Sequence, residues 1–369
     1  MAYDFLIVGG GIAGASAAYA LAARGTVLLL EAEDSTGYHA TGRSAALFTR
    51  NYGGAVVRRV NAASAAFFRA PPGGFCPTPL LTPRGCLTVA QGDAASDLDD
   101  LLAMSEPGED IVPMDPEAAC AMVPFLRPER VSYAVYEANV ADIDVATLHL
   151  SYLKGARARG AQVMTKHAVT ALAHAPAGWS VQTARDSFTA TYVINAAGAW
   201  ADQIGAMVGA RPIGLIPKRR TAIVIDAPPG IDCSNLPALD FAGLDAYFKP
   251  EGGRLMASPG DATPTAPHDA WPDDMDVAVL ADWIERETKL KVEKIRHSWA
   301  GLRSFVADEA PVVGFDPKVP HFFWLAGQGG FGIMMAPALA TLTADLICDG
   351  TAGAASVGFA DELSPRRLQ

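Results

Sequence analysis

The sequence predicts an α/β protein in which a Rossmann-type dinucleotide-binding domain is interleaved with a second domain of mixed sheet. Three observations carry this prediction. They are a strand–glycine turn–helix–strand unit at the N-terminus, a second glycine turn that feeds a helix near residue 330, and a strand-rich middle. A chain of 369 residues, 50% of them hydrophobic, exceeds the usual size of one core, so we expect about two domains.

Residues 4–31 read as one βαβ unit. Its parts, in order, are an apolar strand (4–8), glycines at the three positions of a GxGxxG turn (9–14), an alanine-rich helix (15–24), a second apolar strand (26–30) and Glu31. We expect Gly9 to make the tight turn, Gly11 to let the backbone approach a pyrophosphate, and Gly14 to let helix and strand pack closely. The phosphates would lie at the positive end of the helix dipole. Glu31 would accept hydrogen bonds from the ribose hydroxyls.

Composition and charge narrow the class of protein. Only 19% of the residues are charged and the formal net charge is −11, which argues against nucleic acid as a partner. The cysteines are scattered without a CxxC pair and the histidines without HxxxH spacing, so we expect reduced thiols and no metal site. No apolar run reaches the roughly 18–20 residues of a membrane span, and the early first strand leaves no room for a signal peptide. We therefore expect a protein without an integral membrane segment, either free in the cytoplasm or peripheral to the inner membrane.

Loops and helices dominate the chain between residues 31 and 160. We expect a glycine- and serine-rich loop over 35–44, a helix over 56–68, a sharp break at 71–74, a hairpin around 82–85, and helices near Leu98 and Glu117 in an otherwise irregular stretch from 80 to 139. The stretch 144–160 predicts a helix with an N-cap at Asp142 or Asp144 and a glycine stop.

Strands dominate the second half, which ends in another glycine turn. Three short runs (168–174, 179–184 and 188–195) predict a β-meander that leads into a glycine turn and helix at 195–200. We then expect strands over 213–225, within 246–258 and over 293–305, with a helix over 276–290. A strand over 321–326 leads into the turn 327–332 and a long helix to Cys348, with Pro337 in its first turns.

The nucleotide-binding elements are therefore split between the two ends and the middle of the chain. We assign 1–79, 140–218 and 307–369 to a cofactor-binding domain, and 80–139 and 219–306 to a substrate-binding domain. Such interleaving is typical of flavoproteins, whereas simple NAD dehydrogenases generally have a contiguous Rossmann unit. The second glycine turn could then stabilise negative charge on a flavin pyrimidine ring.

Motifs along the whole chain resemble those of the D-amino-acid oxidase superfamily of FAD enzymes, and are most similar to the bacterial D-arginine dehydrogenases. They are Gly-Ile-Ala-Gly-Ala-Ser (11–16), Gly-Tyr-His-Ala-Thr-Gly-Arg-Ser-Ala-Ala (37–46), Gly-Phe-Cys-Pro (74–77), Ala-Asp-Ile-Asp (141–144), Asn-Ala-Ala-Gly-Ala-Trp (195–200), Pro-Lys-Arg-Arg (217–220), Trp-Ala-Gly-Leu-Arg-Ser-Phe-Val-Ala-Asp (299–308), Gln-Gly-Gly-Phe-Gly-Ile (328–333) and Leu-Ser-Pro-Arg-Arg-Leu (363–368). The resemblance implies a glutathione-reductase-like Rossmann domain that binds FAD non-covalently.

The resemblance also implies which residues hold FAD. They are Gly9, Gly11, Ile12, Ala13, Gly14, Glu31, Gly42, Arg43, Ser44, Ala45, Ala46, Val169, Ala197, Gly198, Trp200, Arg303, Gly329, Gly330, Phe331, Gly332 and Ile333.

Two arginines carry the substrate prediction that the resemblance implies. Arg220 and Arg303 would meet the substrate carboxylate, because an arginine fork forms paired, charge-assisted hydrogen bonds with it. Tyr52 and Tyr247 would line the same pocket, and the backbone of Gly330 would contact the amine. Two other interpretations stay open. Arg220 could belong to a solvated basic face with its two neighbours, and Arg303 could pair with a structural acid.

Three departures from the D-arginine dehydrogenase motifs bear on the substrate side chain. This chain has Cys86 in place of a glutamate that receives the guanidinium, Leu47 in place of a histidine, and Met334 in place of a glutamine. All three changes remove charge or polarity, and a cationic side chain without a counter-charge would suffer the desolvation penalty. We therefore expect a neutral or apolar D-amino acid as substrate.

The reaction implied is oxidative deamination. A hydride would pass from Cα to flavin N5, the imino acid would hydrolyse to a 2-oxo acid and ammonia, and a quinone or other acceptor would reoxidise the flavin. One alternative is an oxygen-using oxidase of the sarcosine or glycine type. Residues 304–327 contain no cysteine for a covalent flavin link and 254–258 no lysine to activate oxygen, which favours a dehydrogenase. The other alternative is a non-catalytic FAD-binding protein.

Overall fold

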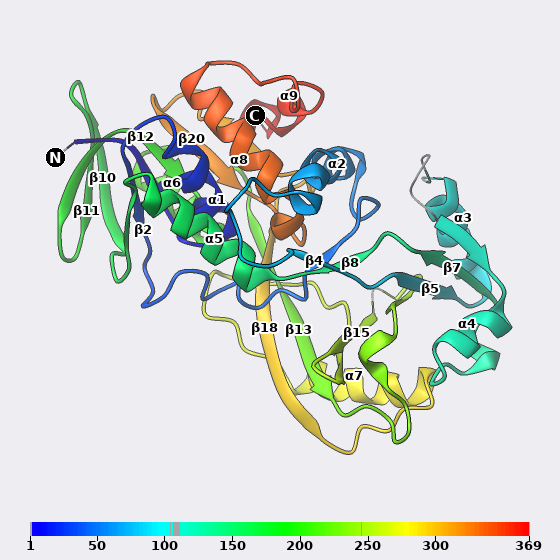
Figure 1. Ribbon diagram of the computed structural model, residues 1–369. Helices are drawn as coiled ribbons and strands as arrows, with labels where there is room; N and C mark the ends of the chain where they lie inside the picture. Colours follow the sequence, from blue (N-terminus) through cyan, green and yellow to red (C-terminus); the bar gives the residue numbers. More distant parts are fainter. Residues whose placement is uncertain (1, 104, 106–110, 245, 369) are drawn as a thin grey trace.

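The computed structural model describes residues 2–103, 105, 111–244 and 246–368, with one large sheet at the upper left of Figure 1 and another at the lower right. The first sheet has the strand order β10–β11–β12–β1–β2–β9, with β20 beside β12 and β19 beside β20. Its strands are β1 (Ala2–Val8), β2 (Val27–Leu30), β9 (Gln162–Met164), β10 (Val169–Ala175), β11 (Gly178–Thr183), β12 (Ser187–Asn195), β19 (Val312–Phe315) and β20 (Phe322–Ala326). The predicted meander is confirmed, because β10, β11 and β12 are antiparallel neighbours.

The central strand β1 is buried on both faces. Phe5 and Ile7 belong to one core with the helices, whereas Leu6 and Val8 belong to another with Trp179 and Trp324. The helices on the first face are α1 (Ile12–Leu21), α2 (Ala55–Arg69), α5 (Val145–Ala158), α8 (Gly332–Cys348) and α9 (Ala360–Leu363), while α6 (Ala201–Met207) lies on the second. A strand covered on both sides has no polar face, which explains the continuous apolar run at 5–8, whereas Asp4 near the start of the strand is exposed.

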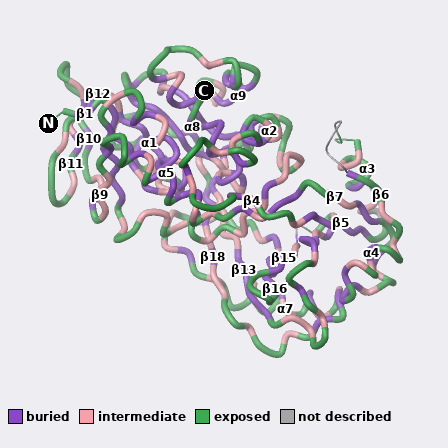
Figure 2. The backbone as a smooth tube through the Cα atoms, viewed as in Figure 1, coloured by how far each residue is buried: buried purple, intermediate pink, exposed green. Residues whose placement is uncertain are grey.

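The second sheet has the order β17–β13–β16–β15–β14–β5–β7–β6, with β18 also paired to β13. Its strands are β5 (Cys86–Ala90), β6 (Ile111–Met114), β7 (Tyr133–Glu137), β13 (Ile216–Ile225), β14 (Ala238–Phe241), β15 (Tyr247–Glu251), β16 (Arg254–Ser258), β17 (Thr263–Pro264) and β18 (Ile295–Phe305). One face carries Ile223, Phe248 and Leu239, which pack against Leu280 and Trp283 of α7 (Asp274–Glu287). Figure 2 marks the buried, half-buried and exposed residues along this sheet and α7, whose buried residues are Leu280, Trp283 and Ile284. Residues at alternate positions point from the other face toward the first sheet.

The predicted hairpin around Thr82–Gly85 is wrong. β4 (Leu81–Pro83) pairs with β8 (Ala141–Ile143) in a small third sheet that also contains β3 (Leu47–Phe48), whereas β5 pairs with β7 and β14 in the second sheet. The chain does bend at Gly85, whose φ is +69°, but it crosses between sheets there. Arg84 holds the crossing through its pair with Asp142 (2.6 Å) and hydrogen bonds to backbone carbonyls.

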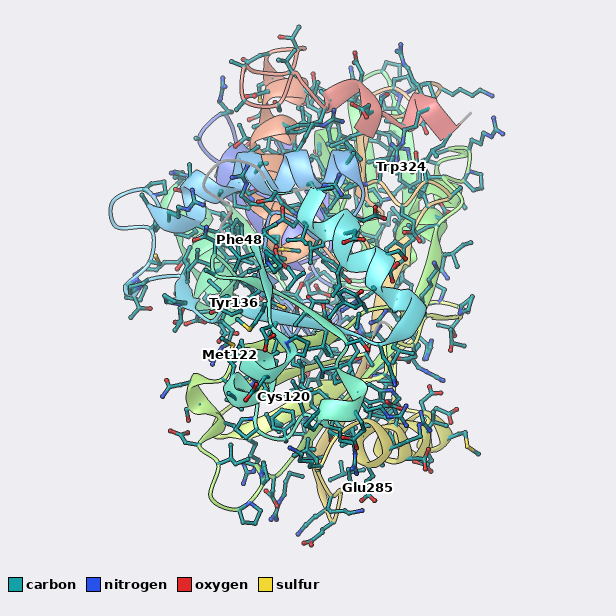
Figure 3. The ribbon with its side chains drawn as sticks, turned by 90° about the vertical axis from the view of Figure 1, so that its right-hand side faces the viewer. Phe48, Cys120, Met122, Tyr136, Glu285 and Trp324 are labelled. Atoms are coloured by element: carbon teal, nitrogen blue, oxygen red, sulfur yellow. The ribbon has the colours of Figure 1, made fainter. Side chains whose placement is uncertain are left out.

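The stretch from 80 to 139 contains more strand than its sequence predicts. The helices α3 (Ala95–Ala103) and α4 (Pro116–Met122) lie at the expected places, but β5, β6 and β7 stand where an irregular stretch was expected. β6 contains Pro113, which weakens its strand signal, and the proline is tolerated because β6 is at the edge of the sheet. In Figure 3, Trp324 of the first sheet lies near the top and Glu285 of α7 near the bottom, with Phe48 and Tyr136 between them. The domain limits assigned from the sequence stay a prediction.

Candidate active site

A cavity lies at the carboxyl ends of the parallel strands β1, β2, β12 and β20 and continues to the inner face of the second sheet. Val8, Leu30 and Ala326 mark the strand ends on its wall, and Arg220 and Arg303 lie at the other end. The strand order reverses beside β1, since β2 lies on one side and β12 on the other. Open α/β sheets bind their ligands at such a switch point.

Most of the predicted cofactor residues line this cavity. They are Gly9, Gly11, Ile12, Ala13, Glu31, Arg43, Ser44, Ala45, Val169, Ala197, Gly198, Trp200, Arg303, Gly329, Gly330, Gly332 and Ile333. In the described part of the chain, Gly14, Gly42, Ala46 and Phe331 are not on its wall. Their direct role in FAD binding stays a prediction.

The first glycine turn leaves no room for side chains at two positions. A Cβ at Gly9 would lie 2.4 Å from the carbonyl oxygen of Ala196, and the φ of Gly9 is +106°. A Cβ at Gly14 would lie 1.9 Å from the carbonyl oxygen of Gly9. The turn therefore packs directly on the end of β12 and on the start of α1, as expected for Gly14. Both glycines are required by contacts within the protein itself.

Side chains far away in the sequence fix the same turn. The N–H of Gly10 donates to Glu31 Oε2 (2.8 Å), and the N–H of Ile12 donates to Thr41 Oγ1 (2.9 Å). His149 Nε2 lies 2.8 Å from the carbonyl oxygen of Gly10. Burial lowers the pKa of His149, although the Gly10 carbonyl opposes this, so the neutral ring is favoured. Glu31 thus holds the turn, in addition to the ribose contact that the sequence predicts.

Arg43 links the loop after β2 to the second sheet. Its guanidinium donates to the carbonyls of Ala270 (2.7 Å) and Ala300 (3.0 Å) and pairs with Asp269. The Trp299 indole donates back to the Arg43 carbonyl (3.0 Å). The Arg43 hydrogen bond lowers the pKa of Asp269 more than burial raises it. Arg43 therefore closes the cavity wall at the junction of the two sheets.

The second glycine turn brings backbone against an arginine. The N–H of Gly329 donates to the carbonyl of Ser304 (2.9 Å), which ties the turn to β18. A Cβ at Gly330 would lie 3.1 Å from Nη1 of Arg303. Because Gly330 has no side chain, the guanidinium of Arg303 can lie directly against the turn. Helix α8 starts just after the turn, at Gly332.

Arg220 and Arg303 lie on the same face of neighbouring strands. β13 and β18 are antiparallel with Arg220 opposite Gly301 and Lys218 opposite Arg303, so both arginines point toward the cavity. Burial lowers the pKa of Arg220, and the charge of Arg303 lowers it further. Among the described residues, Arg220 Nε is buried without a hydrogen-bond partner, and its nearest carboxylate is Asp261 Oδ1 at 4.0 Å. A solvated basic face for Arg220 does not fit this burial.

Arg303 is surrounded by tyrosine hydroxyls rather than by acids. Within the described ranges, no carboxylate oxygen lies within 4.0 Å of its guanidinium. Burial by itself lowers the pKa of Arg303, but the oxygens of Tyr247 and Tyr52 outweigh this and raise it above its ordinary value. Tyr247 lines the cavity, whereas Tyr52 is 44% exposed and packs edge-on against Phe331 (ring centroids 5.0 Å apart). The structure thus brings the predicted substrate residues together around Arg303.

The three residues predicted at the side-chain end of the pocket are placed differently. Leu47 and Cys86 pack in one small apolar cluster with Val140 and Ala238, and Met334 is buried in the core around α8. In the described part of the chain none of the three lines the cavity. Burial, followed by the charges of two nearby acids, raises the pKa of the Cys86 thiol well above its usual value, which argues against a reactive thiolate. Their role in selectivity stays a prediction.

The sequence interpretation missed Thr41, His149, Asp261 and Asp269. Each acts through a contact with a residue distant in the chain, such as His149 with Gly10 across 139 positions. Thr41 lies within the motif 37–46, but nothing in the local patterns of the other three marks them, because isolated polar residues of this kind occur throughout the chain. Only the folded arrangement identifies them.

The chain belongs to the family of FAD-dependent oxidoreductases. The family model described as "DAO: FAD dependent oxidoreductase" matches residues 4–346, almost the whole chain. The superfamily expected from the motifs is confirmed, and so is FAD as its cofactor. The narrower likeness to D-arginine dehydrogenases stays a prediction.

Curated relatives are similar over parts of the chain. "FAD-dependent oxidoreductase domain-containing protein 1" of Xenopus laevis is 32% identical over 192 residues, which are 44% of this chain and 36% of that protein. Mitochondrial dimethylglycine dehydrogenase of Mus musculus is 26% identical over 64% of this chain and 29% of its own length. Glycine oxidase of Geobacillus kaustophilus is 25% identical over 65% of this chain and 62% of its own length. The chain thus spans about a third of the length of the first two.

Solved structures share the fold. Glycine oxidase from Geobacillus kaustophilus superposes with a TM-score of 0.84 at 24% identity, covering 95% of this chain and 96% of that one. L-Proline dehydrogenase from P. horikoshii gives a TM-score of 0.85 at 21% identity, covering 100% and 98%. The predicted fold class, a Rossmann-type domain with an interleaved mixed sheet, is therefore confirmed.

The residues present fit FAD. The backbone of the turn Gly9–Gly11, the N-terminus of α1 and the acid Glu31 line one end of the cavity and suit a dinucleotide there. The Gly329–Gly330 turn and the start of α8 suit the flavin end. No helix within the described ranges is long and apolar enough to span a membrane.

Proposed function

We propose that this protein catalyses the FAD-dependent oxidative deamination of D-amino acids with neutral or apolar side chains, giving 2-oxo acids and ammonia. The observation that carries the proposal is the pair of buried guanidinium groups of Arg220 and Arg303 at one end of the cavity. Arg220 Nε is buried and unpartnered among the described residues, and such a group calls for an anionic ligand. A substrate carboxylate meets that requirement.

The protein's part in the reaction is to orient the substrate. The arginine forks of Arg220 and Arg303 would fix the carboxylate, Tyr247 would close the pocket beside them, and the backbone of Gly330 would hold the amine. Bound FAD would supply the acceptor for the hydride that leaves Cα. No side chain has to act as a base if the amine binds in its neutral form. The positive charges of the arginine pair favour that form, because they disfavour a further positive charge nearby.

The apolar substrate side chain is supported by the motif departures at Leu47, Cys86 and Met334, although none of the three lines the cavity in the described part of the chain. The D configuration is supported by the motif resemblance alone. A quinone-type acceptor in place of oxygen is supported by the absence of a cysteine from 304–327 and of a lysine from 254–258.

A second candidate is an amine oxidoreductase that acts on glycine or an N-methylated glycine. It is favoured by the names of the reported relatives, glycine oxidase and dimethylglycine dehydrogenase. The same arginines would bind the carboxylate, since these amines carry one as well. The two candidates differ in whether the pocket accepts a side chain on Cα or a substituent on nitrogen.

The test is anaerobic reduction of the bound flavin, followed as loss of its visible absorption. The panel contains D-leucine, D-methionine, D-phenylalanine and D-arginine, with L-leucine as the matched control, and glycine, sarcosine and dimethylglycine for the second candidate. We expect the neutral D-amino acids to bleach the flavin fastest and L-leucine not to bleach it. Faster bleaching by glycine or its N-methyl derivatives would favour the second candidate. No bleaching by any of them would indicate a non-catalytic FAD-binding protein.

A further inference from the structure

Asp261 is a buried acid beside the arginine pair that the reaction does not use. It lies in the short loop between β16 and β17, and its side chain is 10% exposed. Its oxygens accept hydrogen bonds from the backbone N–H (2.7 Å) and the hydroxyl (3.0 Å) of Thr221 on β13. Its Oδ1 lies 4.0 Å from Nε of Arg220, the next residue back along that strand.

Asp261 is held beside β13 because neither β16 nor β17 pairs with β13 at Thr221. β13 pairs with β17 at residues 218–219 and with β16 at residues 223–225, which leaves Thr221 facing the loop that joins β16 to β17. The backbone groups of Thr221 are bonded instead by side chains of that loop and of the last residue of β16: Asp261 accepts from its N–H, and Ser258 Oγ donates to its carbonyl (2.7 Å). The carboxylate is therefore fixed in position by the sheet edge, independently of any ligand.

The charges next to the arginine pair are nearly balanced. The other basic side chains nearby have acidic partners: Arg43 with Asp269, Lys218 with Glu309 (3.4 Å), Arg219 with Asp276 (2.7 Å) and Lys249 with Asp142 (3.3 Å). Of the described carboxylates, only that of Asp261 lies within 4.0 Å of either arginine of the pair, so Arg220, Arg303 and Asp261 together carry one net positive charge. Both arginines sense Asp261 electrostatically.

We propose that Asp261 is a built-in counter-charge that leaves the arginine pair with one net positive charge, so that the pocket selects ligands with one carboxylate and rejects dicarboxylates. A single carboxylate with an uncharged amine then brings the buried site to neutrality. A second carboxylate would leave an uncompensated negative charge, which is costly away from water. For substrates, this inference rests on the proposed function and names their class as monocarboxylic amino acids, to the exclusion of D-aspartate, D-glutamate and their analogues.

The test separates the charge of Asp261 from its structural hydrogen bonds. Asp261→Asn keeps an oxygen that can accept from the Thr221 N–H but removes the charge. FAD-loaded protein at pH 8 is titrated with acetate and with malonate, probes with one and two carboxylates, and binding is followed through the perturbation of the flavin's visible absorption. A dianion feels the added positive potential about twice as strongly as a monoanion. We therefore expect Asp261→Asn to tighten acetate about three- to tenfold and malonate about ten- to a hundredfold.

Asp276→Asn is the matched control. It makes the same change in overall charge, but it acts on Arg219, which lies next to Arg220 on the opposite face of β13. We expect this variant to keep the malonate-to-acetate affinity ratio of the unmodified protein, and Asp261→Glu, which retains the charge, to do the same. Equal gains for both probes in Asp261→Asn, or the same change of ratio in Asp276→Asn, would overturn the proposal.

The unmodified protein gives a second, independent readout in case Asp261→Asn does not fold. It should bind acetate at least as tightly as malonate, and tighter binding of malonate would contradict the charge count. These titrations need no turnover. If the protein shows the expected malonate-to-acetate ratio but oxidises no amino acid, the counter-charge proposal is supported and the proposed function is contradicted. Oxidation of neutral D-amino acids together with tighter binding of malonate than of acetate would contradict the counter-charge and support the proposed function.

Discussion

The two ends of the cavity are built by different means. At the dinucleotide end, backbone meets backbone: Gly9 packs on Ala196, and Gly14 packs on Gly9, with no space for a Cβ. At the substrate end, side chains from separate strands meet: Arg220 from β13, Tyr247 from β15 and Arg303 from β18. The first end depends on steric exclusion between closely packed backbone segments, and the second depends on charge and on the register between strands of the second sheet. Mutations should therefore act in different ways at the two ends.

The largest effect is expected at the dinucleotide end. In Gly14→Val the new side chain would collide with the carbonyl of Gly9, so α1 cannot keep its place on β1 and the turn must shift. We expect loss of bound FAD and destabilisation by about 3 kcal/mol or more, as for severe overpacking of a core. Flavin content after purification and the unfolding temperature are the measurements. Gly73→Ala is the control, because a Cβ there meets nothing within 4 Å. Full FAD content in Gly14→Val would show that the turn tolerates repacking.

The substrate end should respond through ligand affinity instead. Arg303→Met or Arg220→Met should leave FAD bound but weaken binding of the substrate carboxylate, because a charge-assisted bond in a buried site is lost. Such losses typically cost about 2–5 kcal/mol, or roughly one to four decades in affinity. The measurement is kcat/KM for D-leucine together with flavin content. Arg219→Met is the control, since Arg219 pairs with Asp276 away from the cavity. Unchanged kinetics in both cavity variants would place the carboxylate elsewhere.

The same contrast explains what the sequence could predict. The glycine turn, the strand before it and the meander at 168–195 follow from local patterns, because apolar runs and glycine spacing are set within a few residues. The strand pairing of β5 could not be predicted, because its partners β7 and β14 lie about 50 and 150 residues further on. Asp261 and His149 were missed for the same reason. Arg220 and Arg303 were identified only because longer motifs around them resemble a known family.

A smaller effect should appear where a distant side chain supports the dinucleotide end. His149→Leu removes the contact of Nε2 with the Gly10 carbonyl (2.8 Å) and leaves that oxygen without its buried donor. A net hydrogen bond is typically worth about 1 kcal/mol, so we expect FAD affinity to fall about five- to tenfold. The measurement is titration of the apoprotein with FAD. His149→Gln, which keeps a donor, should retain most of the affinity. Equal affinity in His149→Leu and the unmodified protein would mean that the turn holds its shape without the histidine.

The smallest effect, and the one that tests selectivity, is expected from Cys86→Glu. If Cys86 lies at the side-chain end of the pocket, a carboxylate there should improve D-arginine relative to D-leucine, and more so together with Leu47→His. The surroundings of Cys86 limit the expected gain of D-arginine relative to D-leucine. Cys86 lies opposite Glu137 on the neighbouring strand, and burial, followed by the charges of Asp240 and Glu137, raises the pKa of its thiol. The same repulsion would raise the pKa of an introduced carboxyl, so its charge would form only in part.

We therefore expect the ratio of kcat/KM for D-arginine over that for D-leucine to rise only about three- to tenfold in Cys86→Glu. A histidine at position 47 could pair with the new carboxylate and recover more of the charge, because Leu47 and Cys86 belong to the same cluster. Cys86→Gln is the control, since it adds the bulk without the charge. An unchanged ratio in the double variant would show that the Leu47–Cys86 cluster supports the cavity wall from behind and has no part in choosing the substrate. A preference for D-arginine in the unmodified protein would point to Glu137 or Asp240 as the counter-charge.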